Sequence, residues 1–218
     1  MEETLPGRNE LPGTQHRLIR RSLLRLIGFG LGTLYAGADR AFARELAGSV
    51  EEIKGEAFAQ AESEQRKLEH AAPLFIADEV TTGAASRLAL HLGKDTMVRL
   101  GELAHLTIDR SLENAGGELT LASGPLLFDT KTGAQPKALN IRTSFALIAV
   151  RGTRFFAGPS AGVFGVFVER GNVAVSAAGR EVVVGDGQGT NIAHPGDEPT
   201  PPAPWKQPRI DAAFASVL

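Results

Sequence analysis

Apolar and polar residues alternate over short stretches in the middle of the chain. These stretches follow one another as Leu88/Leu90/Leu92, Leu106/Ile108 and Leu119/Leu121. A period of two residues is typical of strands that bury one face. Strands of this length, about 8 to 14 residues apart, leave no room for helices between parallel strands. The pattern therefore predicts an all-β fold, as a sandwich, a barrel or a solenoid.

Stronger apolar runs follow in the second half of the chain. They span residues 145–150, 153–156, 163–168 and 182–184. Arg151-Gly152 interrupts the first pair of runs, and residues 169–172 predict a hairpin turn after the third. Gly171 and Gly179 are expected to supply the positive φ angles that tight turns need. The second half is thus predicted to consist of strands joined by short turns.

The two flanks of this region are less regular. Residues 56–69 are rich in Ala, Glu, Gln, Arg and Lys, which favours a helix by propensity. The alternation of alanines at 57, 59 and 61 permits a strand instead. From Pro195 onward the chain is rich in proline, which predicts an extended or disordered tail. Residues 210–218 are a candidate short terminal helix.

The N-terminus has the layout of a twin-arginine export signal. Arg20 and Arg21 precede an apolar run at residues 26–38, and Ala41 and Ala43 flank a phenylalanine. The run is shorter than the roughly 20 apolar residues of a membrane-spanning helix, and its three glycines weaken it further. We expect cleavage after Ala43, export to the periplasm and no stable membrane span in the mature chain.

Two alternatives to a cleaved leader are an uncleaved anchor in the inner membrane and a cytoplasmic basic amphipathic helix. With cleavage, the chain divides into a twin-arginine signal peptide with a signal helix at 1–43, a β domain at 44–193 and a proline-rich C-terminal tail at 194–218.

Composition excludes several classes of protein. The chain has no cysteine, which excludes iron–sulfur clusters, cysteine-ligated haem, disulfides and a lipoprotein anchor. The part after residue 43 carries 17 basic and 21 acidic residues, a net charge of −4. A mildly acidic domain without basic runs argues against nucleic acid and anionic membranes as partners.

The sequence gives little support for a catalytic or metal-binding site. Residues 158–162 fit the G-x-S-x-G pattern of a nucleophile elbow, but an apolar strand rather than a helix follows, so we expect a hairpin loop. The glycine-rich residues 185–189 lack a following helix or lysine and are expected to form a turn. The histidines of the mature chain are not spaced as zinc ligands. No catalytic residue, cofactor or metal is predicted.

Two segments together resemble the FecR family, named for the ferric-citrate regulator of cell-surface signalling. Residues 78–90 are similar to the family's "gd-x-v-x-T-g-x-x-S-x-a-x-L" stretch, and residues 141–155 to its "v-x-T-p-x-a-x-x-x-v-R-G-T-x-F" core. An acidic turn at 169–171 and a "G-x-G-t-x-v"-like stretch at 187–192 follow in the family's order. The resemblance extends over roughly residues 48 to 193.

The resemblance implies a periplasmic β-solenoid or β-roll of many short strands, and strands rather than a helix at residues 50–70. In signalling members such a domain follows a cytoplasmic anti-sigma segment and meets the signalling domain of an outer-membrane transporter. Only about 19 residues precede the twin arginines here, and Ser144 replaces the family's proline. We therefore expect a stand-alone module, and control of a sigma factor is not carried over.

The family signature Arg151-Gly152-Thr153 has two interpretations. Structurally, Gly152 permits a bulge or a close backbone approach, Thr153 hydrogen-bonds locally, and a buried Arg151 requires a carboxylate or carbonyls. Alternatively, Arg151 binds a ligand.

Two functions follow from these expectations. The first is a non-enzymatic exported protein that binds a protein or envelope partner in signalling or sensing, through strand edges. The alternative is a periplasmic carrier of a small ligand (a ferric chelate or a glycan) or a cell-wall-acting enzyme, which requires a polar pocket around Arg151.

Overall fold

The computed structural model describes residues 44–112, 117–131 and 138–218, and all described elements belong to one compact unit. Arg20, Arg21, Ala41 and Ala43 lie outside these residues, so the predicted leader and its cleavage site stay predictions. Over the described ranges, no helix has both the length and the apolarity to cross a membrane.

Eighteen strands and one helix make up the described part of the chain. The first nine strands are β1 (Leu46–Lys54), β2 (Ala57–Ala61), β3 (Glu64–Lys67), β4 (Pro73–Phe75), β5 (Glu79–Thr82), β6 (Arg87–Leu92), β7 (Thr96–Leu100), β8 (His105–Arg110) and β9 (Gly117–Ser123). The others are β10 (Leu126–Thr130), β11 (Leu139–Thr143), β12 (Leu147–Val150), β13 (Arg154–Ser160), β14 (Val163–Arg170), β15 (Val173–Ala177), β16 (Arg180–Val184), β17 (Gln188–Ile192) and β18 (Ala203–Pro204), followed by helix α1 (Gln207–Ala215).

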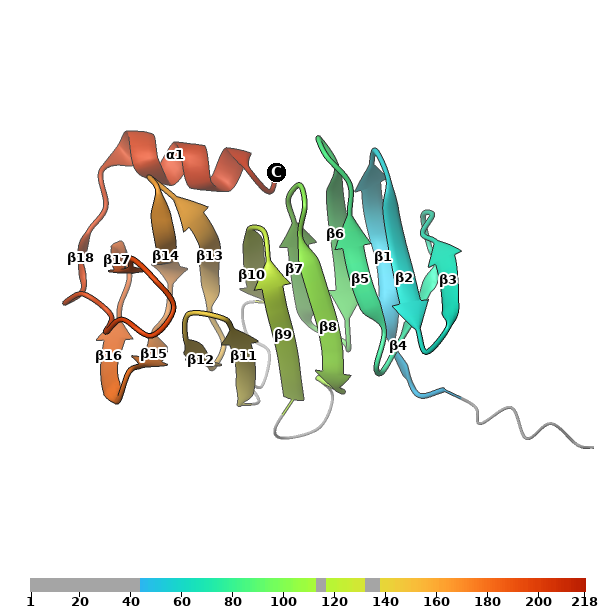
Figure 1. Ribbon diagram of the computed structural model, residues 1–218, viewed down its shortest axis with the longest axis horizontal. Coiled ribbons are helices and arrows are strands. Elements are labelled where there is room, and N and C mark those ends of the chain that lie inside the picture. Colours follow the sequence, from blue (N-terminus) through green and yellow to red (C-terminus); the bar gives the residue numbers. More distant parts are fainter. Residues whose placement is uncertain (1–43, 113–116, 132–137) are drawn as a thin grey trace, which may run out of the picture. The chain divides into compact units, whose positions relative to one another are not determined.

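The strands form two nine-stranded sheets. Sheet A has the order β18-β17-β14-β13-β10-β7-β6-β1-β4, and sheet B the order β16-β15-β12-β11-β9-β8-β5-β2-β3. The chain crosses between the sheets after every one or two strands while it advances along both of them (Figure 1). Neighbouring strands are antiparallel, with a parallel pair at β9 and β11. The predicted all-β class is confirmed, as two sheets of short strands.

The alternation seen in the sequence places one core between the sheets. Leu88, Leu90 and Leu92 of sheet A and Ile108 and Leu119 of sheet B belong to the same buried apolar cluster. Because side chains of a strand point alternately to the two faces, the intervening residues line the outer faces. The outer face of sheet A is where the polar residues of interest gather.

Residues 46–67 form three strands, so the helix favoured by propensity at 56–69 is wrong. Ala57 and Ala59 of β2 are fully buried in the common core, and β2 pairs with both β3 and β5. Packing in the sheet outweighs the weak helix propensity of the segment. The strand reading implied by the family resemblance holds here.

Some predicted hairpin turns are corners between the sheets instead. Residues 169–172 were expected to close a hairpin, but β14 lies in sheet A and β15 lies in sheet B. The interruption at Arg151-Gly152 is likewise the crossing from β12 in sheet B to β13 in sheet A. By contrast, the turn at Gly179 joins two strands of the same sheet, and Ala178 and Gly179 have φ values of 50° and 81°. These two positive φ values match the hairpin turn expected at this position.

The segment after Pro195 is ordered against sheet A rather than free. Strand β18 pairs with β17, and helix α1 then lies across the top of sheet A in Figure 1. The helix buries Ala213 together with Val217 against Leu127, Phe156 and Phe167. The expected terminal helix is therefore present, and it begins at Gln207, three residues earlier than residues 210–218.

Candidate functional site

The family signature lies at the corner between β12 and β13. Arg151 is exposed and makes no hydrogen bond or ion pair with any residue that the structure describes. Gly152 has a φ of 66°, a left-handed conformation that glycine adopts without strain. Thr153 is fully buried, and its Oγ1 has no hydrogen-bond partner among the described atoms. The signature thus shapes a corner and presents one free guanidinium.

A continuous row of residues crosses the outer face of sheet A. Paired positions run from β1 to β17 as Glu52, Ala89, Arg99, Leu127, Phe156, Phe167 and Gly189. The side chains of this row are charged or small near β1 and aromatic in β13 and β14. Helix α1 covers its apolar half, where Leu127, Phe156 and Phe167 form the second buried cluster.

Trp205 anchors the helix at the glycine end of this row. A Cβ atom on Gly165 would lie 2.7 Å from Cη2 of Trp205, so the indole occupies the space that a side chain there would need. The Arg209 guanidinium stacks on the indole at 3.5 Å and donates hydrogen bonds to Ser160 Oγ (3.0 Å) and Asn191 Oδ1 (2.7 Å). Burial lowers the pKa of Arg209. These contacts fasten the C-terminal segment onto β13, β14 and β17.

A second, more polar row lies beside the first. Paired positions there are Ser49, His91, Met97, Asp129, Arg154 and Arg170, from β1 to β14. Asp129 accepts hydrogen bonds from Arg154 (2.6 Å) and Arg170 (2.9 Å), and Arg154 also donates to Glu169. Burial acts to lower the pKa of Arg154, but the hydrogen bond from its guanidinium to Asp129 and the charge of Glu169 raise it overall. Arg154 is therefore held between two carboxylates.

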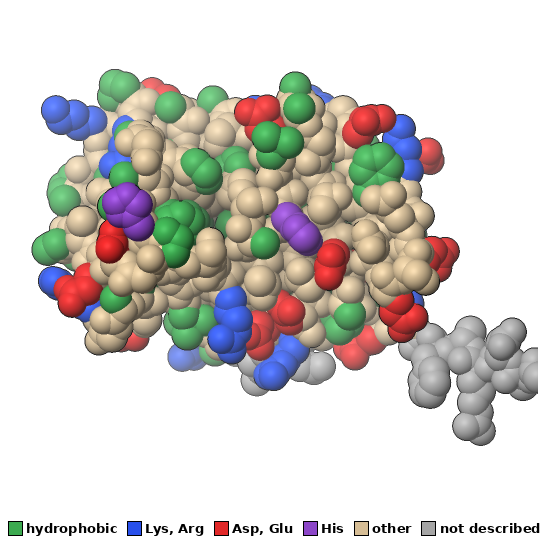
Figure 2. Space-filling view, in the orientation of Figure 1, with side chains coloured by type: hydrophobic (Ala, Val, Ile, Leu, Met, Phe, Trp, Pro, Cys, Tyr) green, Lys and Arg blue, Asp and Glu red, His purple; other side chains and the backbone are tan. Residues whose placement is uncertain are grey.

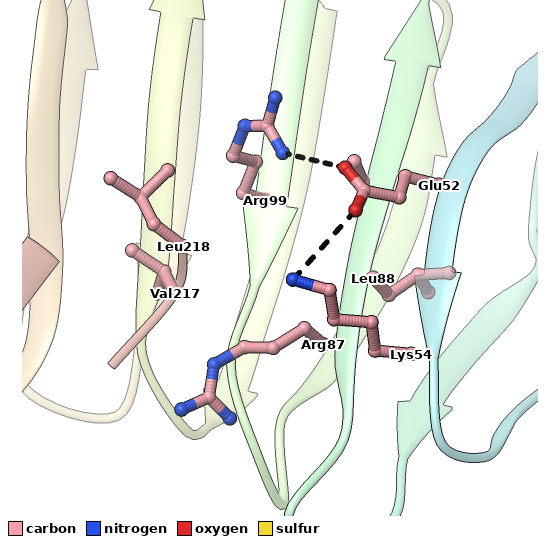
Figure 3. A pocket seen from close by; sticks show the side chains of 8 residues that line it. Glu52, Lys54, Arg87, Leu88, Arg99, Val217 and Leu218 are labelled. Atoms are coloured by element: carbon pink, nitrogen blue, oxygen red, sulfur yellow. Dashed lines mark ion pairs between the residues drawn. The ribbon is translucent and has the colours of Figure 1, made fainter. Parts of the chain in front are cut away.

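A cavity of about 220 Å³ opens between the two rows. Met97, Asp129 and Arg154 line it from the polar row, and Arg99 and Leu127 from the other. A narrower groove continues past Arg99 and is lined by Glu52, Lys54, Arg87, Leu88, Ala89, Val217 and Leu218. Figure 3 shows Arg99, Lys54 and Glu52 turned toward one another, with Val217 and Leu218 on the other side of the groove. This face combines cations, carboxylates and apolar surface in one concave site.

Sheet B offers a different feature, an open edge. Strand β16 is an edge strand of sheet B, and 60% of the surface of its Val183 is exposed. Ala149, Ala174 and Val183 are paired across β12, β15 and β16, which makes a row of small side chains beside the edge that is exposed except at the half-buried Ala174. On the face of the molecule in Figure 2, acidic and basic side chains are scattered without one sign dominating.

The sequence motifs do not assemble into a catalytic centre. Ser160 of the G-x-S-x-G pattern ends β13, and Ala161 and Gly162 turn directly into β14, as the hairpin prediction required. In the turn at 185–189, Asp186 Oδ1 accepts a hydrogen bond from the Gly171 backbone N–H. Within the described ranges, no three His, Cys, Asp or Glu side chains gather as metal ligands would. Arg151 lines neither cavity on sheet A.

The sequence alone did not predict the residues of the sheet A site. Arg99 and Arg154 come from strands that meet only through β10, and no local motif marks either of them. One signal was available for the neighbouring anchor. Gly165 and Gly189 are glycines inside strands, and such glycines often mark a close approach by another part of the chain.

Part of the chain matches a known protein family. Residues 78–174 match the family described as FecR protein, which confirms the resemblance found in the sequence. The matched region begins at the buried Asp78 before β5 and ends in β15, so it includes strands of both sheets. Among curated proteins, none matches the chain.

Solved structures show a similar fold. Two crystal structures of a candidate anti-sigma factor from Parabacteroides distasonis ATCC 8503, at 1.65 and 2.50 Å resolution, superpose with a TM-score of 0.52 and 15% identity. The match covers 62% of this chain and 64% and 63% of those chains, less than two thirds of their length. At this identity, the likeness concerns the fold alone.

Proposed function

We propose that this chain, which carries a FecR domain at residues 78–174, is a non-enzymatic exported signalling module that binds a protein partner in the periplasm or cell envelope. The FecR domain is the observation that carries the proposal. The twin-arginine pattern at Arg20 and Arg21 supports export, and the anti-sigma-like fold neighbours agree with a regulatory role. The repeated crossing between sheets supports the β-roll, or solenoid-like, architecture.

The open edge of sheet B is the proposed contact surface. The edge strands β4 and β18 of sheet A have three and two residues, and β3 at the far edge of sheet B has the charged sequence EQRK. Short or charged edges resist pairing with another chain. Strand β16 has five residues and an exposed valine, so a partner can add an extended strand to it. Arg151 lies at the corner between β12 and β13, where the chain leaves the same sheet B that contains β16. Its guanidinium is available to form an ion pair with a carboxylate of the partner.

Site-specific photo-cross-linking in cells tests this function. A photoreactive phenylalanine at Val183 is expected to capture one defined membrane or periplasmic protein, whereas the same group at Gln65 on β3 captures none. An Arg20→Lys/Arg21→Lys export mutant is the control and should lose the product. Equal capture at both edges, or capture that survives the export mutant, would contradict the proposal.

The alternative function as a carrier or cell-wall enzyme requires a pocket around Arg151. That side chain projects from a corner and lines neither described cavity. Ser160, the candidate nucleophile, accepts a hydrogen bond from Arg209 and has no histidine among its hydrogen-bond partners in the described structure. We therefore prefer partner binding. A fluorophosphonate probe is expected to leave Ser160 unlabelled.

A further inference from the structure

The charged groups of the sheet A cavity differ in how firmly they are paired. Arg154 is held by Asp129 and Glu169, as described above. Among the described residues, Arg99 has a single carboxylate partner, Glu52, at 3.6 Å, and Glu52 also faces Lys54 at 3.9 Å. The Glu52 side chain is 54% exposed and that of Arg99 is 31% exposed. Exposed pairs of this kind are weak, so Glu52 can be exchanged for another carboxylate.

Positive charge exceeds negative charge around this cavity. The side chains that line the cavity and its groove include four cations, Lys54, Arg87, Arg99 and Arg154, and two acids, Glu52 and Asp129, while Glu169 also pairs with Arg154. Arg87 donates its hydrogen bonds to backbone carbonyls, at Ser86 (3.0 Å) and at Ala215 (3.3 Å). An anion that enters here therefore meets a surplus of guanidinium and ammonium groups, and guanidinium matches carboxylate geometry.

The rest of the cavity is apolar. Met97 and Leu127 line it beside Arg99, and the Phe214 ring lies under the Arg154 guanidinium at 5.8 Å. Leu127 is buried and Met97 is half-buried, so a bare inorganic anion would leave the exposed part of Met97 in contact with water, whereas an aliphatic chain would cover it. The volume of about 220 Å³ is below the roughly 300–1,000 Å³ of sites for drug-sized ligands. The site suits a small molecule with one charged end.

We propose that this cavity binds a small aliphatic carboxylate. The carboxylate pairs with the Arg99 guanidinium in place of Glu52, and the aliphatic chain lies against Met97. The site lies on sheet A, whereas the proposed partner edge is β16 of sheet B. The two proposals can therefore fail independently.

Met97 gives a direct spectroscopic probe of the site. The chain has two methionines, Met1 and Met97, so methyl-labelled methionine gives at most two methyl signals from the full chain. Hexanoate is expected to shift the Met97 signal saturably. Inorganic phosphate tests charge without an apolar chain, and hexanamide tests the chain without charge. Both should bind at least tenfold more weakly than hexanoate.

Two variants shift hexanoate binding in opposite directions. Arg99→Gln is expected to weaken it about ten- to hundredfold, the loss typical of one charge-assisted hydrogen bond. Glu52→Gln removes the competing carboxylate and should tighten binding several-fold. Arg180→Gln, at an exposed arginine on β16, controls for the loss of one positive charge and should leave binding unchanged.

Three outcomes would overturn the proposal: no saturable Met97 shift with hexanoate, equal binding of phosphate or hexanamide, or the same weakening in Arg99→Gln and Arg180→Gln. Trp205 fluorescence and circular dichroism verify that each variant is folded. The opposite signs expected for Arg99→Gln and Glu52→Gln distinguish a binding site from a merely structural ion pair.

Discussion

A Cβ atom on Gly189 would overlap with Nε1 of Trp205, so the indole lies directly on the backbone of β17. The indole N–H is buried without a hydrogen-bond partner among the described atoms. Helix α1 has no side-chain cap at its N-terminus, no acidic residue in its first turn and no basic residue in its last. Because the helix has little stability of its own, its docking depends on Trp205 and the apolar cluster beneath it.

Gly189→Ala is therefore expected to displace Trp205. The added methyl group has no space, which resembles overpacking of a core and should cost about 1–3 kcal/mol in the free energy of unfolding. Trp205 is the single tryptophan, so its fluorescence reports the displacement as a red shift. Gly185→Ala is the control, because its Cβ would meet only two polar side chains at 3.3 and 3.4 Å. Similar fluorescence in both variants would disprove the anchoring role.

Asp78→Asn should destabilise the fold at the β5 end. The Asp78 side chain is fully buried and accepts hydrogen bonds from Arg44, Arg66 and the Phe75 backbone N–H (2.8 Å). Removing one partner of a buried ion pair leaves the others uncompensated, and we expect a loss of about 3 kcal/mol. Urea denaturation measures it. Asp197→Asn, in an exposed pair with His194, should cost less than about 1 kcal/mol.

The sequence predicted the strands of this fold better than their connections. Alternation placed Leu88, Leu90 and Leu92 correctly on an inner face. Residues 169–172 predict a hairpin from sequence because a glycine-containing turn has the same local chemistry whether the chain returns to its own sheet or crosses to the other. Pairing of β14 with β17 and of β15 with β12 decides this, and such long-range pairing leaves no local signal.

The same reason explains why the sheet A site could not be predicted. Arg99 and Leu127 are neighbours because β7 pairs with β10 in one particular register. A shift by one residue would turn Arg99 into the core and Val98 or Leu100 out of it. The hydrophobic alternation therefore predicts that Arg99 lies on an outer face. Which residues surround it depends on the order of strands in the sheet.

Thr153→Val tests whether the signature threonine stabilises through its hydroxyl. Since Oγ1 of Thr153 is buried without a partner in the part of the chain that the structure describes, a valine of similar shape should leave stability unchanged or raise it by up to about 1 kcal/mol. Thr190 gives a matched control, because it is equally buried and its Oγ1 donates to the Thr200 carbonyl at 2.6 Å. Thr190→Val should lose about 1–2 kcal/mol. A comparable loss in Thr153→Val would mean that its hydroxyl has a partner.

Acid should remove the contribution of Glu118 to stability. Arg142 donates a hydrogen bond to this carboxylate and, together with the charge of Arg110, holds its pKa below the ordinary value, although burial opposes the shift. A carboxyl with a lowered folded-state pKa stabilises the fold fully above the unfolded pKa of about 4.3. That contribution is lost as the pH falls through the folded value.

The free energies of unfolding of the wild type and Glu118→Gln should therefore differ at pH 6 and converge toward pH 3. Chemical denaturation at a series of pH values measures both curves. Glu198→Gln, at an exposed pair with Arg180, controls for the change in net charge. A difference that stays constant from pH 6 to pH 3 would show that the Glu118 carboxylate contributes through its shape and not through its charge. The contribution of the Arg142 hydrogen bond to the free energy of unfolding would then not depend on pH.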